Sequence, residues 1–269
     1  MHSAPADEPL IEEQKEYYRA RAGEYDDWFE RLGRYDHGPE FRQRWRAEVD
    51  EVRAALERFR PAGRVLELAC GTGWWTEQLL PYADEITAVD FSPEVLALNR
   101  RRVGDTPRVR HAQADIFALQ PEAEYDVVFF SFWLSHVPPE RFEAFWAMVG
   151  RALAPGGRVF FIDSLRTELS TAKDHVLPAP DDVVAERKLD DGRPFRIIKI
   201  FYRPDDLQAR LDPDIFWRVH RSHLVNINKI KEIVPWVSRN YILRMKDAKA
   251  TEIPVSRSQT RRLREYLKL

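Results

Sequence analysis

A short glycine-containing loop limits what this chain can fold into more than any other feature. The run VLELACGTGWW, residues 65–75, is typical of a buried strand, a tight turn with glycines at 71 and 73, and the start of a helix. Glycine permits that turn and lets a ligand approach the backbone, while the new helix offers unpaired N–H groups. The next strand ends in Asp90, 17 residues after Gly73. A carboxylate there suits two vicinal ribose hydroxyls, and the alternative is a plain turn in which Asp90 only caps the next helix.

Short apolar runs alternate with helical patterns from residue 64 onward. Strands are predicted over residues 64–68, 85–89, 109–113, 126–130 and 158–162, with helices over 74–80, 93–101 and 141–152. This alternation predicts an α/β fold, a parallel sheet with helices on both faces. Two helices are predicted before the sheet, one over 18–32 that stops at Gly33 and one over 41–59. After the sheet we expect a loop with one short helix over 163–194, a sixth strand over 195–201 and a short helix over 204–211.

Composition excludes several classes of protein. The 42 basic and 44 acidic side chains nearly balance, which argues against a wholesale nucleic-acid or membrane binder. Cys70 is the only cysteine, so neither an internal disulfide nor a cysteine zinc cage is available, and no metal site is predicted. The acidic N-terminus is unlike a signal peptide, and the longest strongly apolar stretch has eight residues, where a bilayer span needs about 20. A cytoplasmic protein without membrane partners is expected.

The residues next to Gly71 and Gly73 indicate which class of nucleotide-like ligand the loop binds. A dinucleotide enzyme normally has a third glycine where this chain has Thr76, which disfavours an oxidoreductase. An acid, Glu67, instead stands four residues before Gly71. Residues 15–211 resemble the class I S-adenosylmethionine-dependent methyltransferases, whose first motif is acid-x-small-x-G-x-G. Asp90, Asp115 within QADIF, and the sequences YDVVFF and LAPGGRVFFID match that family's later landmarks in order.

The resemblance implies S-adenosylmethionine as cofactor and gives each matching residue a role. Glu67 and the loop backbone of Ala69, Gly71 and Gly73 hold its methionine part, Asp90 grips the ribose, and Asp115 with Ile116 brackets the adenine. Phe91 packs either on the adenine or in the ordinary core. Many family members have glycine where this chain has Ala69, and alanine is tolerated there if its φ stays negative. The aromatic helix over 17–28 resembles the lid of some members, with Tyr18 and Arg21 closing over the cofactor; the alternative is an amphipathic packing helix.

The methyl acceptor is expected beside the segment after the fourth strand, SFWLSHVPP. In S-adenosylmethionine the methyl group is carried by a sulfonium, which is an excellent leaving group. The protein therefore mainly has to orient the acceptor. His136 is the one side chain of that segment able to act as a base near neutral pH, and its alternative is a structural histidine. The nearby VPPE lacks the motif of amino-methylating DNA enzymes, and Cys70 lies in the cofactor loop rather than beside the acceptor. A small-molecule acceptor is therefore favoured.

The charge balance of the whole chain hides a basic C-terminal segment. Residues 212–269 hold 13 basic and six acidic side chains, a net charge of +7. Their sequences FWRVHRSHLVNINKI and IPVSR resemble the latter part of the LytTR-type DNA-binding domain of bacterial response regulators. The short strand-like runs of this segment predict a small, mostly β structure that ends in a basic helix over 256–269. The resemblance implies DNA-contacting positions at Arg221 and Arg257, with Asn226 and Lys229 as phosphate or structural partners in DNA binding. The alternative is a solvated basic surface packed on the enzyme. The full domain needs about forty more residues at its start, so this segment is expected to be incomplete.

The predicted domain boundaries are 1–62 for the N-terminal helices or lid, 63–211 for the methyltransferase domain and 212–269 for the DNA-binding segment. Two functional hypotheses fit this organisation. In the first, the chain is a methyltransferase for a small molecule with a DNA-binding tail. In the second, it is a LytTR-type transcription regulator whose methyltransferase-like domain binds a ligand without turnover.

Overall fold

The computed structural model describes most of the chain, which divides into two compact units. It covers residues 7–121, 123–167 and 170–203, and beyond these residues 207, 210, 216–220, 223–226, 230–236, 240–245, 252–256, 259–261 and 263–264. The first unit combines Met1–Ala154 with Arg158–Phe201, and the second combines Pro155–Gly157 with Tyr202–Leu269. The boundary predicted between residues 211 and 212 stays a prediction.

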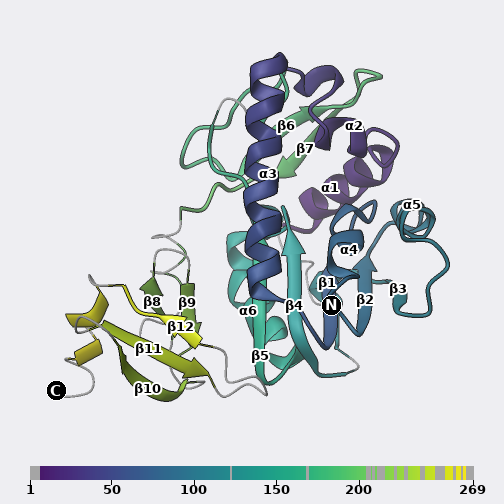
Figure 1. The fold of residues 1–269 in the computed structure, drawn as a ribbon. Helices are drawn as coiled ribbons and strands as arrows, with labels where there is room; N and C mark the ends of the chain where they lie inside the picture. Colours follow the sequence, from purple (N-terminus) through teal and green to yellow (C-terminus); the bar gives the residue numbers. More distant parts are fainter. Residues whose placement is uncertain are drawn as a thin grey trace, which may run out of the picture. The chain divides into compact units, whose positions relative to one another are not determined.

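A five-stranded parallel sheet forms the centre of the first unit (Figure 1). Its strands are β1 (Arg64–Leu68), β2 (Glu85–Asp90), β3 (Val109–Gln113), β4 (Tyr125–Ser131) and β5 (Leu153–Ile162). Their order is β3-β2-β1-β4-β5, and every neighbouring pair is parallel. The strand order reverses between β1 and β4, and ligands of such sheets bind at the carboxyl ends of the strands at this point. The predicted α/β fold is confirmed, although β5 begins five residues earlier than expected because Leu153 already pairs with Tyr125.

Helices cover both faces of the sheet. They are α3 (Pro39–Phe59), α4 (Trp74–Leu79), α5 (Pro93–Val103) and α6 (Phe142–Ala152). Residues of α3, α4 and α5 pack around Val127 and Phe129 on one face. The neighbouring residue Phe130 points to the other face, where its ring lies 5.4 Å from Phe145 of α6. Within the described ranges, no helix combines the length and apolar character needed to cross a bilayer.

The segment before α3 differs from its prediction. It contains α1 (Glu8–Ala20), α2 (Tyr25–Phe29) and the 3₁₀ turn η1 (Gly33–Tyr35). The expected single helix over 18–32 is wrong, because the helix starts ten residues earlier and breaks after Ala20. Pro9 and Glu8 occupy the first turn of α1, where a fixed φ and an acidic charge both favour helix initiation. Gly23, a poor helix former, lies in the break.

A separate two-stranded antiparallel sheet follows the main one. It pairs β6 (Val184–Lys188) with β7 (Pro194–Ile198) and contacts α1. The sixth strand forms, but it spans Pro194–Ile198 and ends three residues before its predicted end at residue 201. The prediction of a loop over 163–194 is wrong because it missed β6. In β6 the buried positions are Ala185 and Arg187, and an arginine on the buried face hides the alternation that identifies a strand.

The second unit is mostly β. A hairpin pairs β8 (Phe216–His220) with β9 (His223–Asn226), and an antiparallel sheet joins β10 (Ile230–Trp236), β11 (Asn240–Met245) and β12 (Glu252–Pro254). Its small core contains Leu243, Val255 and Leu263. Residues 259–261 and 263–264 are helical. The predicted mostly β segment ending in a helix is confirmed.

Candidate functional site

A cavity opens among the ends of β1, β2 and β4 in the first unit. Eight of the predicted site residues line it: Tyr18, Ala69, Gly71, Asp90, Phe91, Asp115, Ile116 and His136. They come from α1, from the turn after β1, from the ends of β2 and β3, and from the segment after β4. Glu67, Gly73 and Arg21 are not among the lining residues. The cavity therefore lies at the strand reversal where a ligand is expected.

Asp90 presents a carboxylate to this cavity from the end of β2. Its Oδ2 accepts a hydrogen bond of 3.1 Å from the backbone N–H of Gly71, and its Oδ1 accepts one of 3.1 Å from Ser92. Burial raises the pKa of Asp90 to about 6, although these backbone donors oppose the shift. The side chain is thus ionised at neutral pH. Fixed in this orientation, it can accept further hydrogen bonds from a pair of hydroxyl groups.

Asn99 of α5, which sequence reasoning missed, holds the glycine loop in place. Its fully buried amide donates hydrogen bonds to the carbonyl of Gly71 at 3.3 Å and to the hydroxyl of Thr76 at 2.9 Å. The sequence did contain a signal for Asn99, because it is a polar residue at a position where the helical pattern of α5 calls for an apolar one. Gly73, with a φ of +91°, lies so close that a Cβ there would be 2.8 Å from the Asn99 Cγ.

Replacing Gly73 with alanine is expected to lower the free energy of unfolding by about 1–2 kcal/mol, because the methyl group adds strain at positive φ and displaces Asn99. Gly150 is the matched control: it lies in α6, and a Cβ there meets no atom within 4 Å. Gly150→Ala should raise stability by about 0.5–1 kcal/mol. Urea unfolding of both variants checks this, and equal effects would remove the steric role assigned to Gly73.

Glu67 lies inside the first unit rather than on the cavity wall. It is only 1% exposed, and its Oε2 accepts a hydrogen bond of 2.7 Å from the hydroxyl of Thr76. Burial raises the pKa of Glu67 to about 8, and the nearby charge of Asp90 acts in the same direction. The carboxyl therefore carries a proton at neutral pH and ties β1 to α4. Its predicted contact with the methionine part of a cofactor stays a prediction.

The backbone is strained at both strands that flank the reversal point. Ala69, after β1, has a φ of +51°, and Phe132, after β4, has a φ of +52°. The condition under which alanine replaces glycine without strain, a negative φ, is therefore not met at Ala69. Residues other than glycine rarely have a positive φ. Such backbone strain is found most often at functional sites, where the surrounding structure enforces it. Both residues line the cavity.

One face of α1 closes the cavity. Ile11, Gln14, Lys15 and Tyr18 line it at helical spacing, and Lys15 forms an ion pair of 2.9 Å with Asp115. Gln14 and Lys15 were missed because the predicted helix began too late, although the spacing of Ile11 and Gln14 ahead of Tyr18 was the signal. Tyr18 lines the cavity and Arg21 does not, and the lid role of both residues stays a prediction.

His136 and Tyr18 form a hydrogen-bonded pair on the cavity wall. The His136 Nδ1 lies 2.6 Å from the carbonyl oxygen of Ile198, so this nitrogen carries the proton and donates. Its Nε2 then accepts from the Tyr18 hydroxyl at 2.7 Å. Burial holds the pKa of His136 well below its usual range, and the charge of Lys199 adds to the effect. The imidazole is therefore neutral, with its one lone pair directed at Tyr18.

The predicted DNA contacts lie largely beyond what the structure describes. Arg221, Lys229 and Arg257 are outside the described residues, and Asn226 ends β9 without a described side chain. Among the described residues, no group of three or more histidine, cysteine, aspartate or glutamate side chains could hold a metal ion.

Two family models match the chain. One is described as a methyltransferase domain and matches residues 65–157; the other is the LytTr DNA-binding domain and matches residues 197–268. The second match begins well before residue 212, where the DNA-binding segment was predicted to start.

Known proteins resemble different parts of the chain. A solved DhpI–SAH complex is 42% identical over 75% of this chain and 85% of that one, with a TM-score of 0.59. DhpI has also been solved with SAM and HEP, at 40% identity over 78% of this chain and 89% of that one, with a TM-score of 0.60. Ubiquinone biosynthesis O-methyltransferase of Aromatoleum aromaticum is 33% identical over 101 residues, 36% of this chain and 42% of that protein.

The C-terminal part has its own relatives. Transcriptional regulatory protein YpdB of Escherichia coli K12 is 49% identical over 61 residues, which make up 23% of this chain and 25% of YpdB. The chain thus matches about a quarter of the length of this curated relative.

Proposed function

The chain belongs to the class I S-adenosylmethionine-dependent methyltransferases, and on that premise we propose that its first unit binds S-adenosylmethionine and methylates a small molecule. The observation that carries this proposal is Asp90, a buried carboxylate fixed by the Gly71 N–H beside a glycine turn in the cavity. The second unit is proposed to bind DNA.

The residues present fit the proposed cofactor. Asp90 offers acceptors for the two ribose hydroxyls, while Phe91 and Ile116 give an apolar wall for a flat base. A Cβ at Gly71 would meet only the Tyr25 ring, at 3.9 Å or more, so the turn leaves room in front of its backbone. When bound, the cofactor supplies an electrophilic methyl group on a sulfonium. The protein then contributes mainly orientation and the exclusion of water.

The Tyr18–His136 pair, together with Phe132 and Trp133, is proposed to face the acceptor. The Tyr18 hydroxyl oxygen can accept a proton from an acceptor atom while its own proton passes to the neutral Nε2 of His136, so that the pair acts as a proton relay. The helix α1 that carries Tyr18 also covers the cavity, which supports the role of a lid.

Turnover distinguishes this proposal from the sensing alternative, which the similarity to YpdB favours. The wild-type protein is incubated with S-adenosylmethionine and fractionated metabolites, and S-adenosylhomocysteine release is measured against Asp90→Ala. Release that depends on a metabolite fraction and is lost in the variant supports the enzyme. Cofactor binding without release from any fraction, combined with DNA affinity that changes when the cofactor is added, would support a ligand sensor.

For the second unit, we expect affinity for duplex DNA selected from a random pool to fall more than tenfold between about 50 and 200 mM salt. The reason is counterion release by basic side chains of a segment with net charge +7. The double variant Arg221→Ala/Arg257→Ala should bind at least about tenfold more weakly. The matched control is Arg44→Ala/Arg53→Ala on the exposed surface of α3, which should bind like wild type. Salt-independent binding, or equal effects of both pairs, would contradict the proposed contacts.

A further inference from the structure

A second cavity opens in the first unit, beside the carboxyl end of β5. It lies between residues 41–52 of α3 and the segments that follow β4 and β5, and its lining includes Trp45, Phe132 and Ser164. Among the described residues, Phe132 is the one that lines both this cavity and the cavity beside Asp90. Methyl transfer in the cavity beside Asp90 leaves the second cavity without an assigned ligand.

Three aromatic rings follow one another along one wall of the second cavity. The centroid of the Phe29 ring lies 5.5 Å from that of Trp45, which in turn lies 6.4 Å from that of Phe132. Val49 and Val52 extend this apolar wall along α3, one and two helical turns after Trp45. Aromatic faces of this kind favour a ligand with a flat apolar body.

Arg31, at the end of α2, lies against the aromatic wall. Its guanidinium carbon is 3.8 Å from the centre of the Trp45 ring and 5.3 Å from that of Tyr35. A guanidinium stacked on a ring keeps the N–H groups of its own plane available to donate. Among the described residues, Arg31 makes no hydrogen bond and no ion pair. Burial lowers the pKa of Arg31, since its charge loses hydration.

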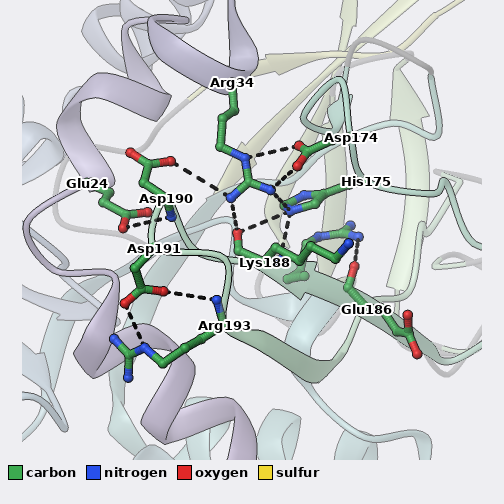
Figure 2. A network of polar contacts seen from close by, with 10 residues as sticks. Glu24, Arg34, Asp174, His175, Glu186, Lys188, Asp190, Asp191 and Arg193 are labelled. Atoms are coloured by element: carbon green, nitrogen blue, oxygen red, sulfur yellow. Dashed lines mark hydrogen bonds and ion pairs between the residues drawn. The ribbon is translucent and has the colours of Figure 1, made fainter.

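Arg34, three residues further along the chain, has the partners that Arg31 lacks. Figure 2 shows its guanidinium bonded to Asp174, to the carbonyl of Lys188 and to His175. The same segment thus holds one arginine whose donors are used within the protein and one whose donors remain available for a ligand.

The carboxylates that line the second cavity are already engaged. The charge of Glu48 acts on Arg31, but its Oε1 accepts a hydrogen bond of 3.0 Å from Arg44. Asp163 accepts two backbone N–H groups, both at 2.8 Å. The uncompensated charge on the wall is therefore the positive charge of Arg31, and it favours an anionic ligand.

Trp75 of α4 supplies a second unused donor to the cavity. It lines the cavity and is 5% exposed, and its indole Nε1 is buried without a hydrogen-bond partner among the described residues. A buried donor without an acceptor is costly, and an acceptor atom of a ligand would remove that cost.

We propose that the second cavity is a further ligand site and takes a planar aromatic carboxylate, whose ring packs on the aromatic wall and whose carboxylate accepts hydrogen bonds from Arg31. The site is separate from the cavity proposed for S-adenosylmethionine. Both ligands are therefore expected to bind at the same time.

The test uses the full chain, with cinnamate as the probe and cinnamamide as its neutral counterpart. Calorimetry measures both affinities, first for the protein alone and then with saturating S-adenosylhomocysteine. Arg31 has a φ of +59°, so Arg31→Gly removes the guanidinium without straining the backbone. Arg60→Gly is the matched control, because Arg60 is an exposed arginine with a φ of +51° at the end of α3 and does not line the cavity.

Wild type and Arg60→Gly should bind cinnamate saturably, with or without S-adenosylhomocysteine. Arg31→Gly should bind it at least about tenfold more weakly, and wild type should bind cinnamamide at least about tenfold more weakly than cinnamate. If Arg31→Gly does not fold, Trp45→Leu, which removes the ring on which the guanidinium stacks, is measured in the same way and should show the same loss.

Four results would overturn the proposal: no saturable cinnamate binding by wild type, equal affinity in Arg31→Gly and Arg60→Gly, equal affinity for cinnamate and cinnamamide, or displacement of cinnamate by S-adenosylhomocysteine. None of them touches the proposed methyltransferase function, which depends on the binding of S-adenosylhomocysteine itself.

Discussion

Replacing Asp90 with alanine should weaken S-adenosylmethionine binding about ten- to hundredfold, the loss expected for charge-assisted hydrogen bonds to a ribose. The variant also removes the acceptor of the Gly71 N–H, which fixes the turn that faces the ligand. Calorimetric titration at neutral pH measures the change. Asp105→Ala, an exposed aspartate in the turn after α5, is the control and should bind like wild type. Unchanged affinity in Asp90→Ala would refute the ribose contact.

The pKa of about 6 at Asp90 adds a pH dependence to the same measurement. Below that pH the carboxyl gains a proton and loses accepting capacity, so affinity should fall roughly tenfold between pH 7 and pH 5. Asp90→Asn cannot ionise and should bind weakly with little pH dependence in this window. A wild-type affinity that is constant from pH 7 to pH 5 would show that ionised Asp90 does not hold the ligand.

Replacing Glu67 with glutamine should stabilise the protein increasingly as the pH rises. The folded-state pKa of Glu67, about 8, lies above the ordinary glutamate pKa of 4.5, so the folded state keeps a proton that the unfolded state releases. Stability from this group is therefore complete below about pH 4.5 and is lost as the pH rises through 8. Glutamine can still accept from the Thr76 hydroxyl but never ionises, and the variant should be more stable than wild type by about 2–4 kcal/mol at pH 8.

Urea unfolding between pH 4.5 and pH 8.5 follows this difference. The matched control is Glu77→Gln, an exposed glutamate on α4, which should track wild type at every pH. If the difference between Glu67→Gln and wild type does not grow with pH, Glu67 is ionised in the folded protein and its assigned place in the β1–α4 packing is wrong. Cofactor titration of the same variant tests the predicted contact of Glu67 with the methionine part.

The central sheet could be predicted because the hydrophobic pattern of its strands in the sequence agrees with their burial in the fold. Most strands of the sheet contain a short apolar run, although β3 carries Arg110, His111 and Gln113. Gly71 and Gly73 allow the tight turn after β1, and Asp90 places a carboxylate at the end of β2. The hairpin strand β6 could not be predicted because Arg187 occupies a buried position.

Other errors came from contacts between segments distant in sequence. A positive φ at Ala69 requires the surrounding turn to enforce it, and nothing in the local sequence reports that strain. Asn99 supports the glycine loop only because α5 packs beside α4. The early start of α1 was readable from Pro9 and from the helical spacing of Ile11 and Tyr18, so that error was avoidable.

Direct titration of the intact chain with S-adenosylmethionine tests the central claim, that the cavity beside Gly71 and Asp90 holds an adenosyl sulfonium. Calorimetry should show saturable binding of one molecule per chain, competition by S-adenosylhomocysteine, and loss of affinity in Asp90→Ala but not in Asp105→Ala. No heat of binding at any practical concentration, with the protein shown to be folded, would contradict it.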